Sequence, residues 1–213
     1  MLGAVIKQNN NEEEHIMKRA SLVSHVMLIS IVLAGCVAAS KTIAINSQSV
    51  RTDVFQEISG TESVPPGYAD LMIRANIKTH VDGYYIGEPK ESAHGKEFYP
   101  FLINIDGQAV LWKVQGKRHE LPKYVDGITS RDPEAGTGMK YELEKKVRLA
   151  AGTHKVFLGL SEEPYHTSAD ISMESGGTYV LEFKPKYWHK RLPTRIPTFL
   201  KGINKYDILM MKL

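Results

Sequence analysis

Apolar and polar side chains alternate along the chain from residue 68 onward, with the period of two that is typical of a half-buried β-strand. The first such run places its apolar residues at Ala69, Leu71, Ile73, Ala75 and Ile77. Similar runs follow at 101–105, 110–114, 139–149, 156–160, 171–173 and 178–183, and residues 206–211 fit a last edge strand. The pattern therefore predicts a series of short strands.

Turn signals lie between these runs. Asp82-Gly83, Asp106-Gly107, Ala151-Gly152 and Gly176-Gly177 each stand where one apolar run ends and another begins, and Asp-Gly pairs favour tight hairpin turns. Residues after Cys36 show no convincing helical period over three turns. We therefore expect an all-β fold, an antiparallel β-sandwich over residues 68–213.

Two segments interrupt the strand pattern. Residues 115–138 are polar and rich in Gly and Pro, which predicts a long loop and makes this segment a candidate binding surface. Residues 37–67 are rich in Ser, Thr, Gln and Asn and end in Pro65-Pro66-Gly67. This composition predicts that residues 36–67 form a flexible tether in front of the sandwich.

The N-terminal part has the pattern of a signal peptide. Lys18 and Arg19 precede an apolar stretch from Leu22 to Leu33, which is short for a membrane span of about 20 residues. We interpret residues 1–35 as this signal helix. Because residues 8–14 are polar and acidic, we expect translation to begin at Met17. An uncleaved membrane anchor is the alternative interpretation.

The run Leu33-Ala34-Gly35-Cys36 resembles the lipobox of bacterial lipoproteins. The resemblance implies cleavage between Gly35 and Cys36, acylation of Cys36, and a protein held on the membrane of the cell envelope by lipid. Because Val37, rather than Asp, follows the cysteine, the resemblance favours the periplasmic face of the outer membrane.

Composition excludes several kinds of site and partner. Cys36 is the single cysteine among 213 residues, so no intramolecular disulfide and no cysteine-based metal motif can form. The net charge of +3 is too small to indicate a nucleic-acid partner.

Three further stretches resemble DUF2846-like lipoproteins: residues 103–107, residues 149–156 and Gly176-Gly177-Thr178-Tyr179-Val180. Residues 81–89, from Val81 to Pro89, resemble the start of PEGA-type surface domains instead. Either resemblance implies a sandwich of the prealbumin or immunoglobulin-like kind, generally without catalytic activity.

Catalytic motifs are absent from the sequence: it has no Gly-x-Ser-x-Gly elbow, phosphate-binding loop, dinucleotide fingerprint or His-Glu-x-x-His helix. His80 and Asp82 would share one face of a strand, and His94 and His119 could join them as metal ligands. Solvated loop histidines are the favoured interpretation, so we predict no metal, no cofactor and no catalytic residue. The adjacent carboxylates at 162 and 163 are likewise interpreted as a solvated loop.

Cations and aromatic rings occur together near the C-terminus, at Lys186, Tyr187, Trp188, Lys190 and Arg191. This combination suits an anionic membrane surface or glycan. The leading hypothesis is a lipid-anchored envelope protein with a non-catalytic binding or scaffolding role, partnered by an envelope protein or an anionic glycan. The alternatives are an envelope hydrolase or metal-dependent enzyme, and a structural subunit of an envelope complex.

Overall fold

The computed structural model describes residues 38–60, 62–188 and 202–213. The predicted signal peptide, the lipidation site at Gly35 and Cys36, and Lys190 and Arg191 lie outside the described residues. The chain divides into two compact units, Met1–Thr42 and Ile43–Leu213. In the first unit the described residues are helical, and the Thr42 hydroxyl donates to the Ala38 carbonyl oxygen at 3.0 Å. Among the described residues, no helix has the length and apolar character needed to cross a membrane.

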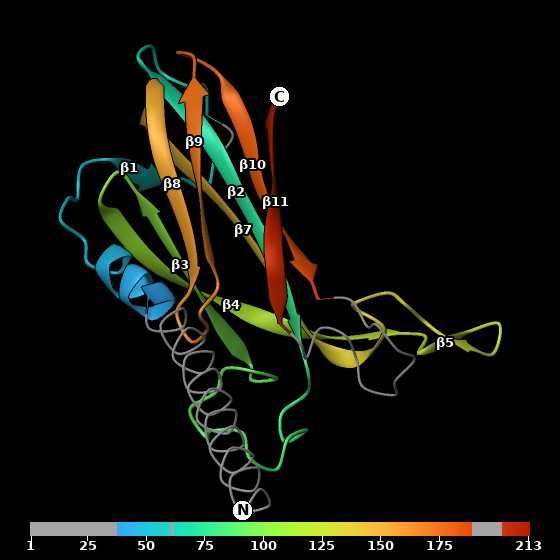
Figure 1. Cartoon of the computed structure of the whole chain (residues 1–213). Coiled ribbons are helices and arrows are strands. Elements are labelled where there is room, and N and C mark those ends of the chain that lie inside the picture. Colours follow the sequence, from blue (N-terminus) through green and yellow to red (C-terminus); the bar gives the residue numbers. More distant parts are fainter. Residues whose placement is uncertain (1–37, 61, 189–201) are drawn as a thin grey trace, which may run out of the picture. The chain divides into compact units, whose positions relative to one another are not determined.

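Nearly all of the regular secondary structure described in the second unit is β-strand, which confirms the all-β prediction (Figure 1). The strands are β1 (Phe55–Glu57), β2 (Tyr68–Thr79), β3 (Phe98–Ile105), β4 (Gln108–Leu121), β5 (Tyr124–Val125), β6 (Ile128–Thr129), β7 (Gly136–Ala150), β8 (Gly152–Leu160), β9 (His166–Met173), β10 (Thr178–Tyr187) and β11 (Ile203–Lys212).

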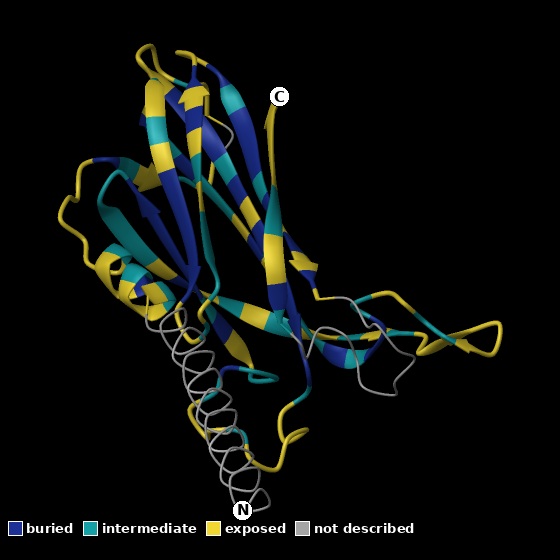
Figure 2. Ribbon diagram, in the orientation of Figure 1, coloured by how far each residue is buried: buried dark blue, intermediate teal, exposed yellow. Residues whose placement is uncertain are grey.

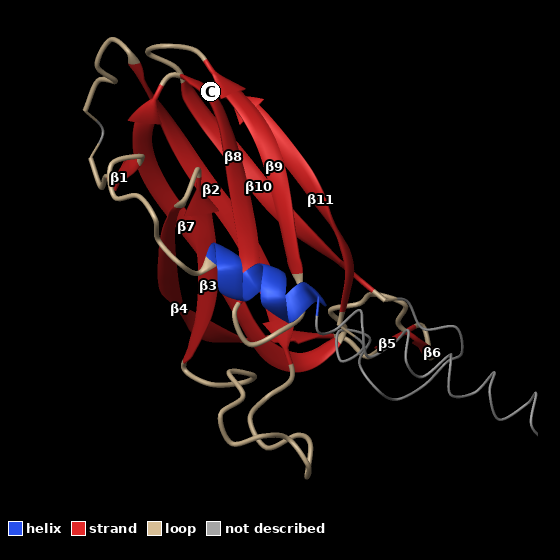
Figure 3. Ribbon diagram, turned by 60° about the vertical axis from the view of Figure 1, so that its left-hand side comes forward, coloured by secondary structure: helices blue, strands red, loops and turns tan. Residues whose placement is uncertain are grey.

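One continuous sheet runs in the order β11-β10-β2-β7-β4-β3-β8-β9, with β1 added beside β7. The sheet curls until its two edge strands, β11 and β9, approach each other, so it is nearly closed like a barrel (Figure 3). The predicted antiparallel arrangement is wrong for one pair, because β10 lies parallel to β2. Alternating side chains have the same period in either direction, so the pattern could not distinguish the two.

Inward-facing side chains of all the long strands form one core, visible as buried stretches along the strands in Figure 2. The largest fully buried apolar side chains include Tyr99, Phe101, Tyr141, Phe183 and Leu71. The predicted register of β2 is confirmed, since Leu71 and Ile73 have no exposed surface and Ala75 and Ile77 have 5% or less. Burial of this alternate set is what holds the sheet in its curled form.

Residues 115–138 differ from the long loop expected of them. β4 continues to Leu121, β7 begins at Gly136, and the β5–β6 hairpin between them projects from the sheet (Figure 1). The register pairs residues 116–121 with residues 136–141. Pairing between two mostly polar strands leaves no apolar alternation for a sequence pattern to detect.

Structured elements also occur within residues 36–67, where the sequence predicts a tether. Residues 38–46 form a helix, and Ile43 is buried with Leu102 and Phe157. The Gln108 side-chain oxygen accepts the backbone N–H groups of Val54 and Phe55 at 2.7 and 3.0 Å, which fixes the chain as it enters β1.

Candidate metal centre

A loop at one end of the barrel, residues 80–97 between β2 and β3, carries the chemically most distinctive cluster of the second unit (Figure 3). His80 directly follows β2 and is 3% exposed. Gly95 brings the returning chain back against the start of the loop: its φ is +70°, and an added Cβ would lie 2.0 Å from the Asp82 nitrogen. The loop is thus folded on itself, which brings residues 80 and 94 together.

Three potential ligand atoms converge inside this loop. His80 Nε2 lies 3.2 Å from Glu88 Oε1, His94 Nδ1 lies 3.1 Å from the same oxygen, and the two nitrogens are 3.0 Å apart. A tetrahedral zinc ion with bonds near 2.0–2.1 Å separates its ligands by about 3.3 Å. An octahedral ion with slightly longer bonds separates adjacent ligands by about 3.0 Å. The observed triangle has the size that either kind of ion requires.

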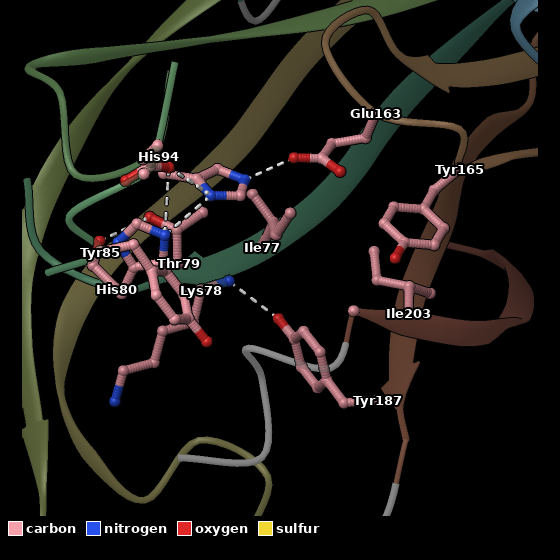
Figure 4. Close-up of a pocket in the computed structure, with 13 residues that line it drawn as sticks. Ile77, Lys78, Thr79, His80, Tyr85, His94, Glu163, Tyr165, Tyr187 and Ile203 are labelled. Carbon is pink, nitrogen blue, oxygen red and sulfur yellow. Dashed lines mark hydrogen bonds and ion pairs between the residues drawn. The ribbon is translucent and has the colours of Figure 1, made fainter. Parts of the chain in front are cut away.

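The outer nitrogen of each histidine has its own partner. His80 Nδ1 lies 2.9 Å from the Val81 carbonyl oxygen, and His94 Nε2 lies 2.5 Å from Glu163 Oε1, a contact drawn in Figure 4. A carbonyl oxygen can only accept, so His80 Nδ1 carries the hydrogen and its Nε2 is left with a lone pair. The Glu163 carboxylate likewise accepts from His94 Nε2, so Nδ1 is the His94 nitrogen that can bind a metal.

Glu88 is held by a further contact. The Ser92 hydroxyl donates to Glu88 Oε1 at 2.7 Å and accepts the His94 backbone N–H at 3.2 Å. Ser92 thereby ties the carboxylate ligand to one of the histidine ligands. Ligands oriented by such outer contacts are a regular feature of protein metal sites.

Charge around His94 opposes the effect of its burial. Burial alone would lower the pKa of His94, but the carboxylates of Glu163 and Glu88 outweigh it, and the pKa lies above its usual value. The loop therefore presents a cation-attracting environment at this imidazole.

The cluster forms one wall of a cavity of about 550 Å³. Most of the other walls are apolar or aromatic, from Ile77, Tyr85, Tyr165, Tyr187 and Ile203 (Figure 4). The Tyr187 hydroxyl accepts the Lys78 backbone N–H at 2.8 Å. The Lys78 side chain points away from the histidines in Figure 4, and its ammonium donates to the Gly136 carbonyl oxygen at 2.8 Å and to that of Glu134.

Two of the four residues weighed from sequence as metal ligands, His80 and His94, lie in this cluster. Asp82 instead pairs with Lys96 at 2.8 Å, and His119 lies on β4, paired in register with Gly138. The sequence did not indicate Glu88, and the interpretation of Glu163 as part of a solvated loop is wrong, because its side chain is 18% exposed and contacts His94. Glu163 joins the cluster from the turn between β8 and β9, a tertiary contact that no local spacing could reveal.

The residues of the predicted basic and aromatic surface differ in their exposure. Tyr187 is 4% exposed and lines the cavity, whereas Trp188 is 52% exposed. Lys186 forms an ion pair with Asp207 at 3.2 Å. Of the five residues, Lys186 and Trp188 are therefore the ones that the described structure leaves for a surface partner.

Comparison of the chain with protein-family models, with curated proteins and with solved structures gave no match.

Proposed function

We propose that this domain binds a divalent first-row transition metal through His80 Nε2, Glu88 Oε1 and His94 Nδ1. The observation that carries the proposal is the convergence of these three atoms within 3.2 Å of one another. When both imidazoles are neutral and donate through their outer nitrogens, their inner nitrogens and the carboxylate oxygen can offer lone pairs to an ion between them.

The ligand types restrict the ion. Imidazole nitrogen suits zinc, iron, copper and nickel, whereas magnesium and calcium prefer oxygen ligands. Two histidines and one carboxylate bind zinc in many hydrolytic sites and iron(II) in oxygen-activating sites. Zinc and iron(II) are therefore the ions that we expect to be found in the protein.

We further propose that this metal centre belongs to a protein of the cell envelope. The lipobox-like run ending at Cys36 supports a lipid-anchored protein on the periplasmic face of the outer membrane. In this proposal, the metal ion is the ligand of the binding protein that the sequence predicts. Assignment to a prealbumin- or immunoglobulin-like sandwich remains a proposal, supported by the short strands and their Asp-Gly turns.

Metal analysis tests the proposal directly. The full chain, purified in mild detergent and stripped with a chelator, is titrated with zinc and with iron(II) under anaerobic conditions. We expect one ion per chain, bound by the wild type and by His154→Gln, and lost in His94→Ala. His154 serves as the control because it contacts Asp106 and the Ala150 carbonyl oxygen, outside the cluster. Equal metal binding by wild type and His94→Ala would refute the proposed site.

A further inference from the structure

The three ligands leave the metal accessible from the cavity, and this inference rests on the proposed function. His80, Glu88 and His94 all line the same cavity of about 550 Å³, which is within the usual size of small-molecule sites. No fourth histidine or carboxylate is grouped with them among the described residues. A structural zinc site is closed by four protein ligands, whereas a catalytic site keeps one position for water or substrate. The arrangement here matches the second kind.

Charge at the site selects the kind of ligand. The divalent ion is balanced by two carboxylates, Glu88 bound to it and Glu163 behind His94. Among the described lining residues there is one lysine, Lys78, and its ammonium donates to the backbone carbonyl oxygens of Glu134 and Gly136. Because no cation of the described lining faces the three ligands to compensate an anion, an uncharged donor fits better. A carbonyl oxygen is such a donor, and a divalent ion polarises it.

The cavity walls determine what the part of the ligand away from the metal can be. Ile77, Ile203 and the rings of Tyr85, Tyr165 and Tyr187 surround the space beside the ligands (Figure 4). Such walls gain free energy by burying an apolar group, by an amount that grows with its area. The ligand that fits both features is a small uncharged molecule with one carbonyl group and an apolar body.

We propose that the centre is a hydrolase site for small, uncharged esters or amides. The ion would lower the pKa of a water bound at the open position, which would lose a proton to solvent, and would polarise the carbonyl oxygen as this enters as a fifth ligand. The resulting hydroxide adds to the carbonyl carbon and forms a new C–O bond. The bond to the alkoxy or amino group then breaks, the leaving group takes the electron pair and a proton from solvent, and an acid and an alcohol or amine result. The reaction consumes water alone, so no oxidant or reductant is required.

Hydrolysis of p-nitrophenyl acetate, butyrate and hexanoate by the zinc-loaded full chain tests the inference. We expect kcat/KM to rise by up to about fourfold for each added methylene, the gain that burial of one such group provides. We expect His154→Gln to match the wild type and His94→Ala to fall to the rate of free zinc in the same detergent. A wild-type rate equal to that of His94→Ala would overturn the inference.

A second measurement reports on the open position without turnover. The full chain is loaded with cobalt(II), and acetohydroxamate, a small oxygen donor, is added while the visible absorption of the ion is followed. A saturable spectral change supports an open position facing the cavity. Bound cobalt whose spectrum does not respond would overturn the hydrolase inference and leave the metal-binding function standing. Failure to bind cobalt or zinc would instead refute the proposed function itself.

Discussion

Glu163 contacts His94 and would act on a bound metal through that residue rather than directly. Its carboxylate accepts the His94 Nε2 hydrogen at 2.5 Å, which fixes the ring and increases its basicity. Glu163→Gln keeps an acceptor oxygen but removes the charge. We expect zinc affinity, measured by competition with a chromophoric chelator, to fall by about 10- to 100-fold, the usual effect of losing such a partner.

The neighbouring residue supplies the control for this prediction. Glu162 is the adjacent glutamate and has the same charge as Glu163. It is exposed and takes no part in the cluster. Glu162→Gln should leave zinc affinity unchanged. If both variants weakened binding equally, a general loss of negative charge, and not the contact with His94, would be responsible.

Residue types alone allowed part of this cluster to be predicted. His80 and His94 were candidates because imidazole is a common metal ligand. The same reasoning from residue type also included Asp82 and His119, which lie outside the cluster. Glu163 could not be predicted in this way. It lies 69 residues from His94, and the curl of the sheet brings the two together. No pattern along a single sequence encodes that approach.

Gly95 is the glycine at which the loop of residues 80–97 packs closely against its own start. Gly95 has a φ of +70°, which favours glycine, and a methyl group there would meet the Asp82 backbone nitrogen at 2.0 Å. Gly95→Ala should therefore push apart the two ends of the loop that carry His80 and His94. We expect zinc affinity, measured by the same chelator competition, to fall at least about tenfold, since ligand geometry must be kept within a few tenths of an ångström.

Gly87 provides the matched substitution in the same loop. It lies beside the ligand Glu88, has nothing within 4 Å of an added Cβ, and does not adopt a positive φ. Gly87→Ala should bind zinc as the wild type does. Normal affinity in Gly95→Ala would mean that the loop tolerates rearrangement, against the close packing seen here.

Strands with one buried face could be predicted from the sequence, and strands without one could not. The apolar residues at alternate positions of β2 all face the core, so its period of two was visible, although Asp70 and Lys78 on the other face are buried as well. The later half of β4 is exposed or half-buried throughout, and its pairing with β7 depends on backbone hydrogen bonds that any residue can make. The helix at 38–46 lies within a segment whose polar composition predicted a tether. The overall composition of a polar segment does not reveal a short helix within it.

Stability of the whole sheet depends on a buried carboxylate where β2 meets β7. Asp70 has no exposed surface, and its oxygens accept from Arg148 at 2.7 and 3.2 Å and contact the Lys146 ammonium at 2.9 Å. Burial alone would raise the pKa of Asp70, but the hydrogen bonds and charges of Arg148 and Lys146 outweigh it and lower the pKa. The ionised form is thus favoured by folding.

The direction of this shift determines how stability depends on pH. Because the folded pKa lies below the unfolded value of about 3.9, the contribution of Asp70 is fully present above that pH and disappears as the pH falls through the folded pKa. Asp70→Asn should lower the free energy of unfolding by about 2 kcal/mol at pH 7, the scale of hydrogen bonds to charged groups. The difference from wild type, measured by urea unfolding, should stay constant down to about pH 5 and shrink towards pH 2. Asp53→Asn, which removes an exposed pair with Arg51, should show little effect at either pH. A wild-type advantage over Asp70→Asn that persisted unchanged at pH 2 would show that packing, rather than the charge on Asp70, joins these two strands.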